Sequence, residues 1–352
     1  MNFPLIALVS FLVGSLMTTL GIVFFPKMGL MDRPERYGLK RKPIPYYGGI
    51  LIFATFLISI ILTVPITANV IGLLIGSFII VLVGFLDDKY SLSPVLRLGM
   101  QVLAAMCLIV FGIGILSITN PLGGVIDLNL WQIDLSFIGI GTVVPIVGAL
   151  FTIVWIVLIT NTMNFLDGVP GLTSGISFIA ALTIFFLSIR PDIHQDVHSQ
   201  VTVAAIALIV AFAAFAFLIF DFPKPKILMG DSGSTFFGFV LATLAIFSGG
   251  KVATAFLVLG IPILDASWTV IRRLMKGKKP WEGDLEHLHH KLLDLGVSAR
   301  GVLLILYTLS VVFGVLAVVC TSSKQKLFIM IGLGILMGLL LLALLFTSKR
   351  RK

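Results

Sequence analysis

The strongest constraint on this chain is a series of apolar runs, each about twenty residues long, that end at Pro, Gly or charged residues. A helical run of that length crosses the hydrocarbon core of a bilayer. The composition, with 58% hydrophobic residues and a mean hydropathy of +1.13, excludes an ordinary soluble domain. We therefore predict an all-α, polytopic integral membrane protein that forms one domain over residues 1–352.

Hydropathy predicts about eleven spanning helices. They lie near residues 3–26, 48–66, 69–86, 96–118, 145–160, 172–189, 201–220, 233–249, 251–272, 301–321 and 325–346. The loop 119–144 contains the alternating sequence VIDLNLWQID, which predicts a short β-hairpin on the periplasmic side.

The distribution of charge predicts the orientation of the helices. With the N-terminus outside and an odd number of spans, 21 of the 25 Lys and Arg residues lie inside, as the positive-inside rule requires. The predicted topology is N-out and C-in. Membrane topology and attraction to anionic lipid explain most of these basic residues, so no nucleic-acid partner is expected. Twelve of the 16 acidic residues also lie at or near the inside face, which is where we expect the chemistry.

The segment GFLDDKY at 84–90 places two carboxylates, Asp87 and Asp88, at the end of an apolar run. Neighbouring carboxylates repel each other unless a cation or hydrogen bonds compensate. The pair therefore suggests a Mg²⁺ site, a general base, or both. The structural alternative is a solvated helix end.

A second polar segment is NTMNFLDGVPGL at 161–172, where Asn161, Asn164 and Asp167 recur every third residue. That spacing places the three side chains on one face of a last helical turn, where they require a ligand or each other. Helix capping and turn formation are the alternative.

The third segment, KILMGDSGSTFFG at 226–238, places Asp231 in a Gly/Ser loop that opens the next helix. Amides at a helix N-terminus can hold a phosphate. The alternative is that Asp231 or Ser232 caps the helix.

The fourth segment, EGDLEHLHHKLLDLG at 282–296, contains three of the five histidines, His287, His289 and His290. A zinc site is not favoured, because the segment has no His-Glu-x-x-His pattern and no nearby cysteine. With Arg272, Arg273 and Lys279 close in sequence, an anionic diphosphate is the better ligand.

In this order, GFLDDKYSLSPVLR, NTMNFLDG, MGDSGS and DLEHLHH resemble the motifs of the polyprenyl-phosphate N-acetylhexosamine-1-phosphate transferases. The resemblance covers roughly residues 1–346. It implies transfer of N-acetylglucosamine 1-phosphate from UDP-N-acetylglucosamine to undecaprenyl phosphate with release of UMP, an early step of cell-envelope glycan synthesis. It also implies a bacterial inner-membrane location with the active site on the cytoplasmic face, and dimerisation is common among such enzymes.

The resemblance also implies roles for individual residues. Asp231 is expected to be the first Mg²⁺ ligand and Asn164 the second, with Mn²⁺ as an alternative ion. Asp87 would deprotonate or align the lipid phosphate, and Asp88 would shape the field of the metal. Direct displacement is expected in preference to a covalent aspartyl intermediate. Arg97 would grip the β-phosphate, Asp167 would orient the nucleotide, and the remaining expected substrate or catalytic contacts are Asn161, His287, His289 and His290.

Two departures from the family pattern affect the nucleotide contacts. Relatives usually read DGLDGL, whereas this chain reads DGVPGL, so Pro170 replaces a carboxylate expected near the uridine. The first inner loop lacks the usual Arg-Lys-x-His, and its substrate-binding residue is left open among Arg36, Lys40, Arg41 and Lys42.

Several alternatives are weighed against this interpretation. The sequence HLHH favours N-acetylglucosamine, while the related phospho-N-acetylmuramoyl-pentapeptide transferases typically have three consecutive histidines. A transporter would gather its polar groups at mid-membrane, not on one face. An intramembrane hydrolase would need a nucleophile or zinc motif. Asp265, an ionisable residue inside a predicted span, is expected to pair with a neighbouring helix.

Overall fold

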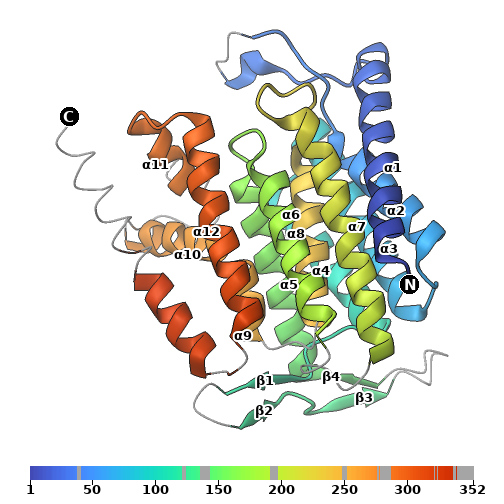
Figure 1. The fold of residues 1–352 in the computed structure, drawn as a ribbon, viewed down its shortest axis with the longest axis vertical. Coiled ribbons are helices and arrows are strands. Elements are labelled where there is room, and N and C mark those ends of the chain that lie inside the picture. Colours follow the sequence, from blue (N-terminus) through green and yellow to red (C-terminus); the bar gives the residue numbers. More distant parts are fainter. Residues whose placement is uncertain are drawn as a thin grey trace.

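The computed structural model describes residues 1–37, 41–120, 124–134, 143–190, 197–247, 252–275, 277, 287–320, 322, 324–335 and 338. Most of the helices run side by side as one bundle, and short strands lie across one end of it (Figure 1). The connection between the first and second helices lies at the opposite end (Figure 1). The two ends therefore carry different structures, which matters for the location of the site.

Twelve labelled α-helices lie within the described residues (Figure 1). They are α1 (Phe3–Phe24), α2 (Gly48–Thr63), α3 (Ala68–Tyr90), α4 (Pro94–Val110), α5 (Ile146–Leu166), α6 (Leu172–Ser188), α7 (Val197–Asp221), α8 (Gly230–Phe247), α9 (Val252–Val258), α10 (Gly260–Met275), α11 (Leu288–Asp294) and α12 (Ala299–Val319). Two 3₁₀ turns, η1 (Pro26–Met28) and η2 (Pro34–Tyr37), lie in the loop between α1 and α2. Residues 324–335 are also helical.

Six helices of the described chain are long and apolar enough to cross a membrane: α1, α3, α5, residues 200–221 of α7, α8 and α12. The helices α2, α4 and α6 are apolar but shorter. These helices confirm an all-α, multi-pass membrane protein. The count of about eleven spans and the N-out orientation stay predictions.

Local sequence signals set several helix boundaries. Thr67 caps α3 by accepting from the amide of Val70, and Ser93 caps α4 by accepting from the amide of Leu96 at 3.3 Å. Pro94 follows Ser93 in the first turn, where its missing N–H costs no hydrogen bond. The short α3–α4 connection therefore holds the end of α3, which carries Asp87, close to α4.

Helix α8 is the central helix of the bundle. In its apolar window 78% of the residues are buried, against 28% for α1 at the periphery. It packs against α2, α3, α5, α6 and α7. Close approach requires glycine at two contacts with its first turn, because a Cβ on Gly49 or Gly84 would collide with the backbone at Ser232 and Gly233. The first turn of α8 is therefore fixed by backbone contacts from α2 and α3.

Two predicted elements differ in detail, and a third is only partly described. The predicted helix 251–272 is two helices, α9 and α10, which part at Leu259, where Gly260 packs against the ring of Phe313. The end of the predicted helix 325–346 lies outside the described residues.

In the loop 119–144, the strands VID and QID both form, but they do not pair with each other. Antiparallel pairs join β1 (Ser117–Thr119) to β2 (Val125–Asp127) and β3 (Gln132–Asp134) to β4 (Val143–Pro145). Residues 121–123 and 135–142 lie outside the described part.

Candidate active site

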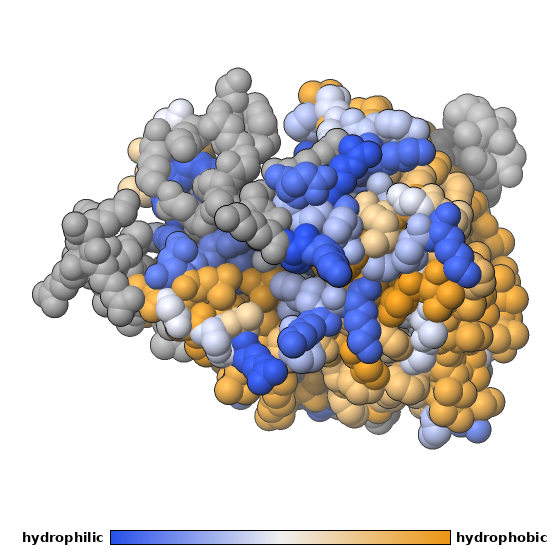
Figure 2. All heavy atoms as spheres, turned by 90° about the horizontal axis from the view of Figure 1, so that it is seen from above, coloured by the Kyte–Doolittle hydropathy of each residue, from blue (hydrophilic) through white to orange (hydrophobic). Residues whose placement is uncertain are grey.

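Three of the four sequence motifs meet at one end of the bundle. The end of α3, the end of α5 and the start of α8 come together there, opposite the end that carries the strands (Figure 1). Seen from this end, hydrophilic side chains gather over the middle of the molecule, and apolar side chains border them below and to the right (Figure 2). A polar site beside an apolar surface suits a reaction between a water-soluble and a lipid-soluble substrate.

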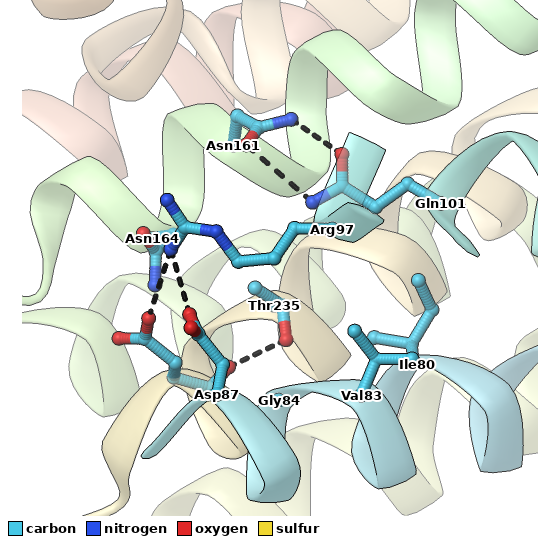
Figure 3. Close-up of a pocket in the computed structure, with 10 residues that line it drawn as sticks. Ile80, Val83, Gly84, Asp87, Arg97, Gln101, Asn161, Asn164 and Thr235 are labelled. Atoms are coloured by element: carbon cyan, nitrogen blue, oxygen red, sulfur yellow. Dashed lines mark hydrogen bonds and ion pairs between the residues drawn. The ribbon is translucent and has the colours of Figure 1, made fainter. Parts of the chain in front are cut away.

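Arg97 bridges two carboxylates that come from different motifs. Its Nη1 lies 2.7 Å from Oδ2 of Asp87 and 3.5 Å from Oδ2 of Asp231 (Figure 3). The Asp87 side chain is buried, and its other oxygen accepts from the amide of Leu92 at 2.7 Å. The guanidinium therefore offsets the repulsion between Asp87 and Asp231, as a bound cation would.

Asp88, the neighbour of Asp87, caps helix α8. Oδ1 accepts from the amide of Asp231 at 2.9 Å and from the hydroxyl of Tyr46 at 2.9 Å. Oδ2 accepts from the amide and hydroxyl of Ser232 at 3.3 and 3.2 Å. Gly230 has a φ of +71°, and a Cβ there would lie 2.5 Å from Oδ2 of Asp88, so glycine is required.

This cap corrects two sequence-based interpretations. The amides of Asp231 and Ser232 already donate to Asp88, so neither is free to bind a phosphate as the Gly/Ser loop suggested. The cap of α8 also comes from α3, not from within the MGDSGS motif. Asp88 therefore fixes the position of Asp231, and this is a structural role.

The predicted shared face of Asn161, Asn164 and Asp167 does not form, because α5 ends at Leu166 and Asp167 has left the helix. Asn161 exchanges hydrogen bonds with Gln101, 2.7 Å from its Nδ2 to Oε1 and 3.4 Å in return (Figure 3). Asn164 donates to the hydroxyl of Ser234 at 3.0 Å and also interacts with the carboxylate of Asp231. Asn164 therefore belongs to the Asp231 cluster.

Two cavities meet at Asp231. The smaller one is lined by Asp87, Arg97, Asn164 and the apolar side chains of α3, and Asn161 and Gln101 lie at its far side (Figure 3). The larger one is an open cleft of about 600 Å³, a volume typical of sites for small molecules. Its lining includes Asp88, Asp167, Asp221, Asp231, Arg33, Arg41, Lys89 and Pro170.

Asp167 and Asp221 make one part of the larger cleft acidic. Oδ2 of Asp221 accepts from the amide of Gly171 at 2.8 Å and the hydroxyl of Ser174 at 2.9 Å. Although solvent reaches Asp167 from the cleft, the loss of hydration against surrounding protein raises its pKa well above the ordinary value. The nearby carboxylate of Asp221 raises this pKa further.

His289 packs against the turn that carries Asp167. None of the three motif histidines lines either of the two cavities. His287 and His289 are buried, and their rings are parallel with centroids 5.8 Å apart. The ring of His289 fills the space that a side chain at Gly168 would need. Burial lowers the pKa of His289 to about 3, so this ring is neutral at physiological pH.

The predicted Mg²⁺ ligands fit that ion. Asp231 and Asn164 interact directly, and Asp87 joins Asp231 through Arg97. Mg²⁺ prefers oxygen ligands and usually takes one or two carboxylates together with substrate phosphates and water. The described residues contain no group of three or more His, Cys, Asp or Glu arranged to hold an ion alone. The set is therefore incomplete for a structural metal and suited to one that arrives with a diphosphate.

Several residues of the site were not found from the sequence. No sequence pattern pointed to Gln101 or Tyr46, because their hydrogen-bond partners, Asn161 and Asp88, are about 40 or more positions away. Asp221 could have been found, because it directly follows an apolar run, as Asp87 does. Arg33 and Arg41 line the cleft, and Arg41 is held by Asp32 at 2.5 Å. Of the open choices in the first loop, Lys40 and the Arg36 side chain lie outside the described part.

Comparisons with known proteins give the chain's relationships. It is 29% identical over 304 residues to a probable undecaprenyl-phosphate N-acetylglucosaminyl 1-phosphate transferase of Bacillus subtilis, covering 84% of this chain and 79% of the relative. It is 28% identical over 342 residues to the decaprenyl-phosphate N-acetylglucosaminephosphotransferase of Mycobacterium tuberculosis, covering 89% and 81%. An Escherichia coli undecaprenyl-phosphate alpha-N-acetylglucosaminyl 1-phosphate transferase is 28% identical over 297 residues, covering 81% and 76%.

The family model for glycosyl transferase family 4 matches residues 70–249, just over half of the chain. The matched region runs from α3 to the end of α8 and contains Asp87, Asp88, Asn164 and Asp231. The match and the convergence of these residues agree, and the protein belongs to glycosyl transferase family 4.

Proposed function

We propose that this protein transfers N-acetylglucosamine 1-phosphate from UDP-N-acetylglucosamine to a polyprenyl phosphate and releases UMP. The observation that carries the proposal is the cluster of Asp87, Arg97, Asn164 and Asp231 at the junction of two cavities. The named activities of the relatives support the same donor sugar and the same class of acceptor. The product would begin a cell-envelope glycan.

The two cavities suit two different substrates. The larger cleft carries Arg33, Arg41 and Lys89 beside five carboxylates, so these basic side chains would hold a nucleotide diphosphate only together with Mg²⁺. The smaller cavity has apolar walls from α3 and a single guanidinium, that of Arg97. The smaller cavity has a volume of only about 30 Å³, so we assign the phosphate group of the lipid to it on the condition that Arg97 moves away from Asp87. We assign the UDP-sugar to the cleft. Asp231 lines both and would lie where the two phosphates meet.

Each side chain has a defined task in this arrangement. Asp231 and Asn164 would hold Mg²⁺, or Mn²⁺ as the alternative, and the ion would neutralise diphosphate charge as the transfer proceeds. Arg97 would leave its bridge between the carboxylates and bind phosphate oxygens. Asp87, freed from Arg97, would align the lipid phosphate or accept its proton. Asp167 would contact the nucleotide from the rim of the cleft.

The chemical step would be a direct displacement. An oxygen of the lipid phosphate attacks the β-phosphorus of the UDP-sugar, and the bond between that phosphorus and the bridging oxygen breaks. UMP leaves with the bond's electron pair, and the sugar phosphate stays on the lipid as a diphosphate. Access to Asp231 from two cavities supports this course, because both reactants can reach one phosphorus without a covalent enzyme intermediate.

The chemistry also supports an orientation. A UDP-sugar is supplied from the cytoplasm, so the end of the bundle with the two cavities would face the cytoplasm of a bacterial inner membrane. The strands lie at the other end, and α1 runs from the N-terminus toward the end with the cavities, which agrees with the N-out topology that the basic residues predict (Figure 1).

The test mixes purified protein with undecaprenyl phosphate, Mg²⁺ and a panel of UDP-N-acetylhexosamines, and measures UMP. UMP release with UDP-N-acetylglucosamine is expected, and no release with any donor would reject the proposal. Asp231→Asn should abolish Mg²⁺-dependent turnover. Asp127→Asn is the matched control, because Asp127 lies in β2 at the opposite end and is exposed. Unchanged turnover in Asp231→Asn would remove this residue from the metal site.

A further inference from the structure

Asp265 forms a buried contact with the histidine motif that the proposed reaction does not explain. Oδ2 of Asp265 lies 2.9 Å from Nδ1 of His287, and Oδ1 accepts from the amide of Leu288 at 2.7 Å. Only 3% of Asp265 and 4% of His287 is exposed. Asp265 lies in α10 and His287 directly precedes α11, so the carboxylate joins two helices.

Helix capping explains only half of this contact. His287 is the N-cap residue of α11, and its own side chain makes no capping hydrogen bond, so Oδ1 of Asp265 serves as the cap through Leu288. Capping does not require Oδ2 to bind the ring of the preceding residue. The two oxygens therefore hold both the backbone and the imidazole of the motif.

The contact with Asp265 also determines which ring nitrogen of His287 carries the proton. A carboxylate only accepts hydrogen bonds, so the proton of a neutral His287 lies on Nδ1. The hydroxyl of Thr269, 3.3 Å from Nδ1, lies on the same side of the ring. No described residue hydrogen-bonds Nε2 of His287. In this tautomer Nε2 carries a lone pair and can accept a hydrogen bond or a proton.

The position of the ring links it to the site. The ring of His287 lies 5.6 Å from that of Phe165 and is parallel to that of His289, which packs on Gly168. Phe165 lies in the last turn of α5 and Gly168 directly follows Asp167, which lines the cleft. Asp265 thus holds the histidine motif against the turn that carries a cleft carboxylate.

We propose that Asp265 is a positioning residue, which fixes the orientation and the Nδ1–H tautomer of His287 so that Nε2 serves as an acceptor. This inference rests on the proposed transferase function. A ring with an unprotonated Nε2 cannot donate to a phosphate oxygen. Because the ring is buried and lines neither cavity, the fixed tautomer would act on the site through the turn of Asp167, against which the histidine motif packs.

The variant Asp265→Asn separates an effect on the His287 tautomer from an effect on folding. Its Oδ1 can still accept from the amide of Leu288, but its NH₂ group would face Nδ1 and force the proton to Nε2. We expect turnover to fall on the order of 100-fold, with an unchanged thermal midpoint and little change in the KM for the UDP-sugar. Asp294→Asn, at the exposed end of α11, is the matched control and should keep full turnover.

A second variant isolates the role of Nε2. His287→Asn keeps a donor near the Nδ1 position but has no Nε2, so its loss should match that of Asp265→Asn. The double variant should lose no more than either single variant, because both changes remove one function. Losses that multiply, or full turnover in Asp265→Asn, would overturn the proposal.

Nitrogen NMR of the wild-type protein with ¹⁵N-labelled histidine tests the tautomer directly. A protonated Nδ1 and an unprotonated Nε2 are expected for His287, assigned by the resonance that disappears in His287→Asn. A protonated Nε2 would refute the inference. This measurement needs no substrate, so it decides the Asp265 contact even if the wild type releases no UMP, a result that would reject the proposed function alone.

Discussion

Replacing Asp88 by Asn tests whether this carboxylate holds α8 in place or acts on substrate. Asp88 accepts four hydrogen bonds, from the amides of Asp231 and Ser232 and from the hydroxyls of Ser232 and Tyr46. Asn has one acceptor oxygen, so it can keep at most the two bonds at Oδ1. Its NH₂ group would then face the amide of Ser232, which is also a donor.

The expected magnitude follows from that count. The Ser232 hydroxyl can accept from the new NH₂ group, whereas the bond from the Ser232 amide is lost. A bond to a carboxylate is charge-assisted, so this loss reduces the free energy of unfolding by roughly 2 kcal/mol. For a chain of 352 residues, that change lowers the thermal midpoint by about 3 °C. Because the amide of Asp231 loses part of its anchor, the Mg²⁺ concentration for half-maximal turnover should rise about tenfold or more.

The assay records thermal midpoints and Mg²⁺ titrations of UMP release for Asp88→Asn and Asp87→Asn side by side. Asp87→Asn should keep a thermal midpoint close to that of the wild type, since its oxygen still accepts from Leu92, and should lose turnover at every Mg²⁺ concentration. For Asp88→Asn, added Mg²⁺ should restore part of the activity. If Asp88→Asn instead kept the wild-type midpoint and Mg²⁺ dependence while losing turnover, the capping argument would be wrong.

Three further predictions concern the cleft and the histidines. Gly168→Ala should lower the thermal midpoint, since its Cβ would strike the His289 ring, whereas Gly99→Ala, in open space, should not. Asp221→Ala should cost about 1–3 kcal/mol of stability by leaving the Gly171 amide unpaired, measured as a lower midpoint. The pKa of His289 is about 3 when folded and near 6.5 when unfolded, so stability should fall as pH drops below 6.5, by about 2 kcal/mol at pH 5. His289→Gln should flatten that dependence, and an unchanged slope would contradict it.

Helices were the best-predicted part of the fold because apolar runs of spanning length are a local signal. The predicted helix 3–26 corresponds to Phe3–Phe24, and 301–321 to Ala299–Val319. The predicted end of the third helix at 86 was too early, because Asp87 and Asp88 continue α3 to Tyr90. Two carboxylates at a helix C-terminus oppose its dipole, and here Arg97 and the start of α8 compensate from outside the helix.

The predicted site residues came together only in part. Asp87, Asp231 and Asn164 were found from short motifs, and the structure places them in one cluster. Their roles depend on pairings that no short segment encodes. Asp88 binds residues more than 140 positions away, and Asp265 pairs with a ring 22 positions later.

The predicted strands show the same limit. The alternating sequence VIDLNLWQID identified both strands of the 119–144 loop but not their partners. In an alternating run, side-chain period fixes which residues face the same side, while the partner strand depends on chain geometry. The flanking segments at Ser117–Thr119 and Val143–Pro145 supply that geometry.

The glycines that face the first turn of α8 have a consequence for how this enzyme can diversify. Gly49 and Gly84 leave no room between that turn and its neighbours, so even one added methyl group would displace the backbone that carries Asp231. Variation in substrate preference must therefore arise at the rim, where Arg33 and Arg41 border the cleft on a loop. The backbone around Asp231 is closed to even a small change, while the loop at the entrance has room to vary.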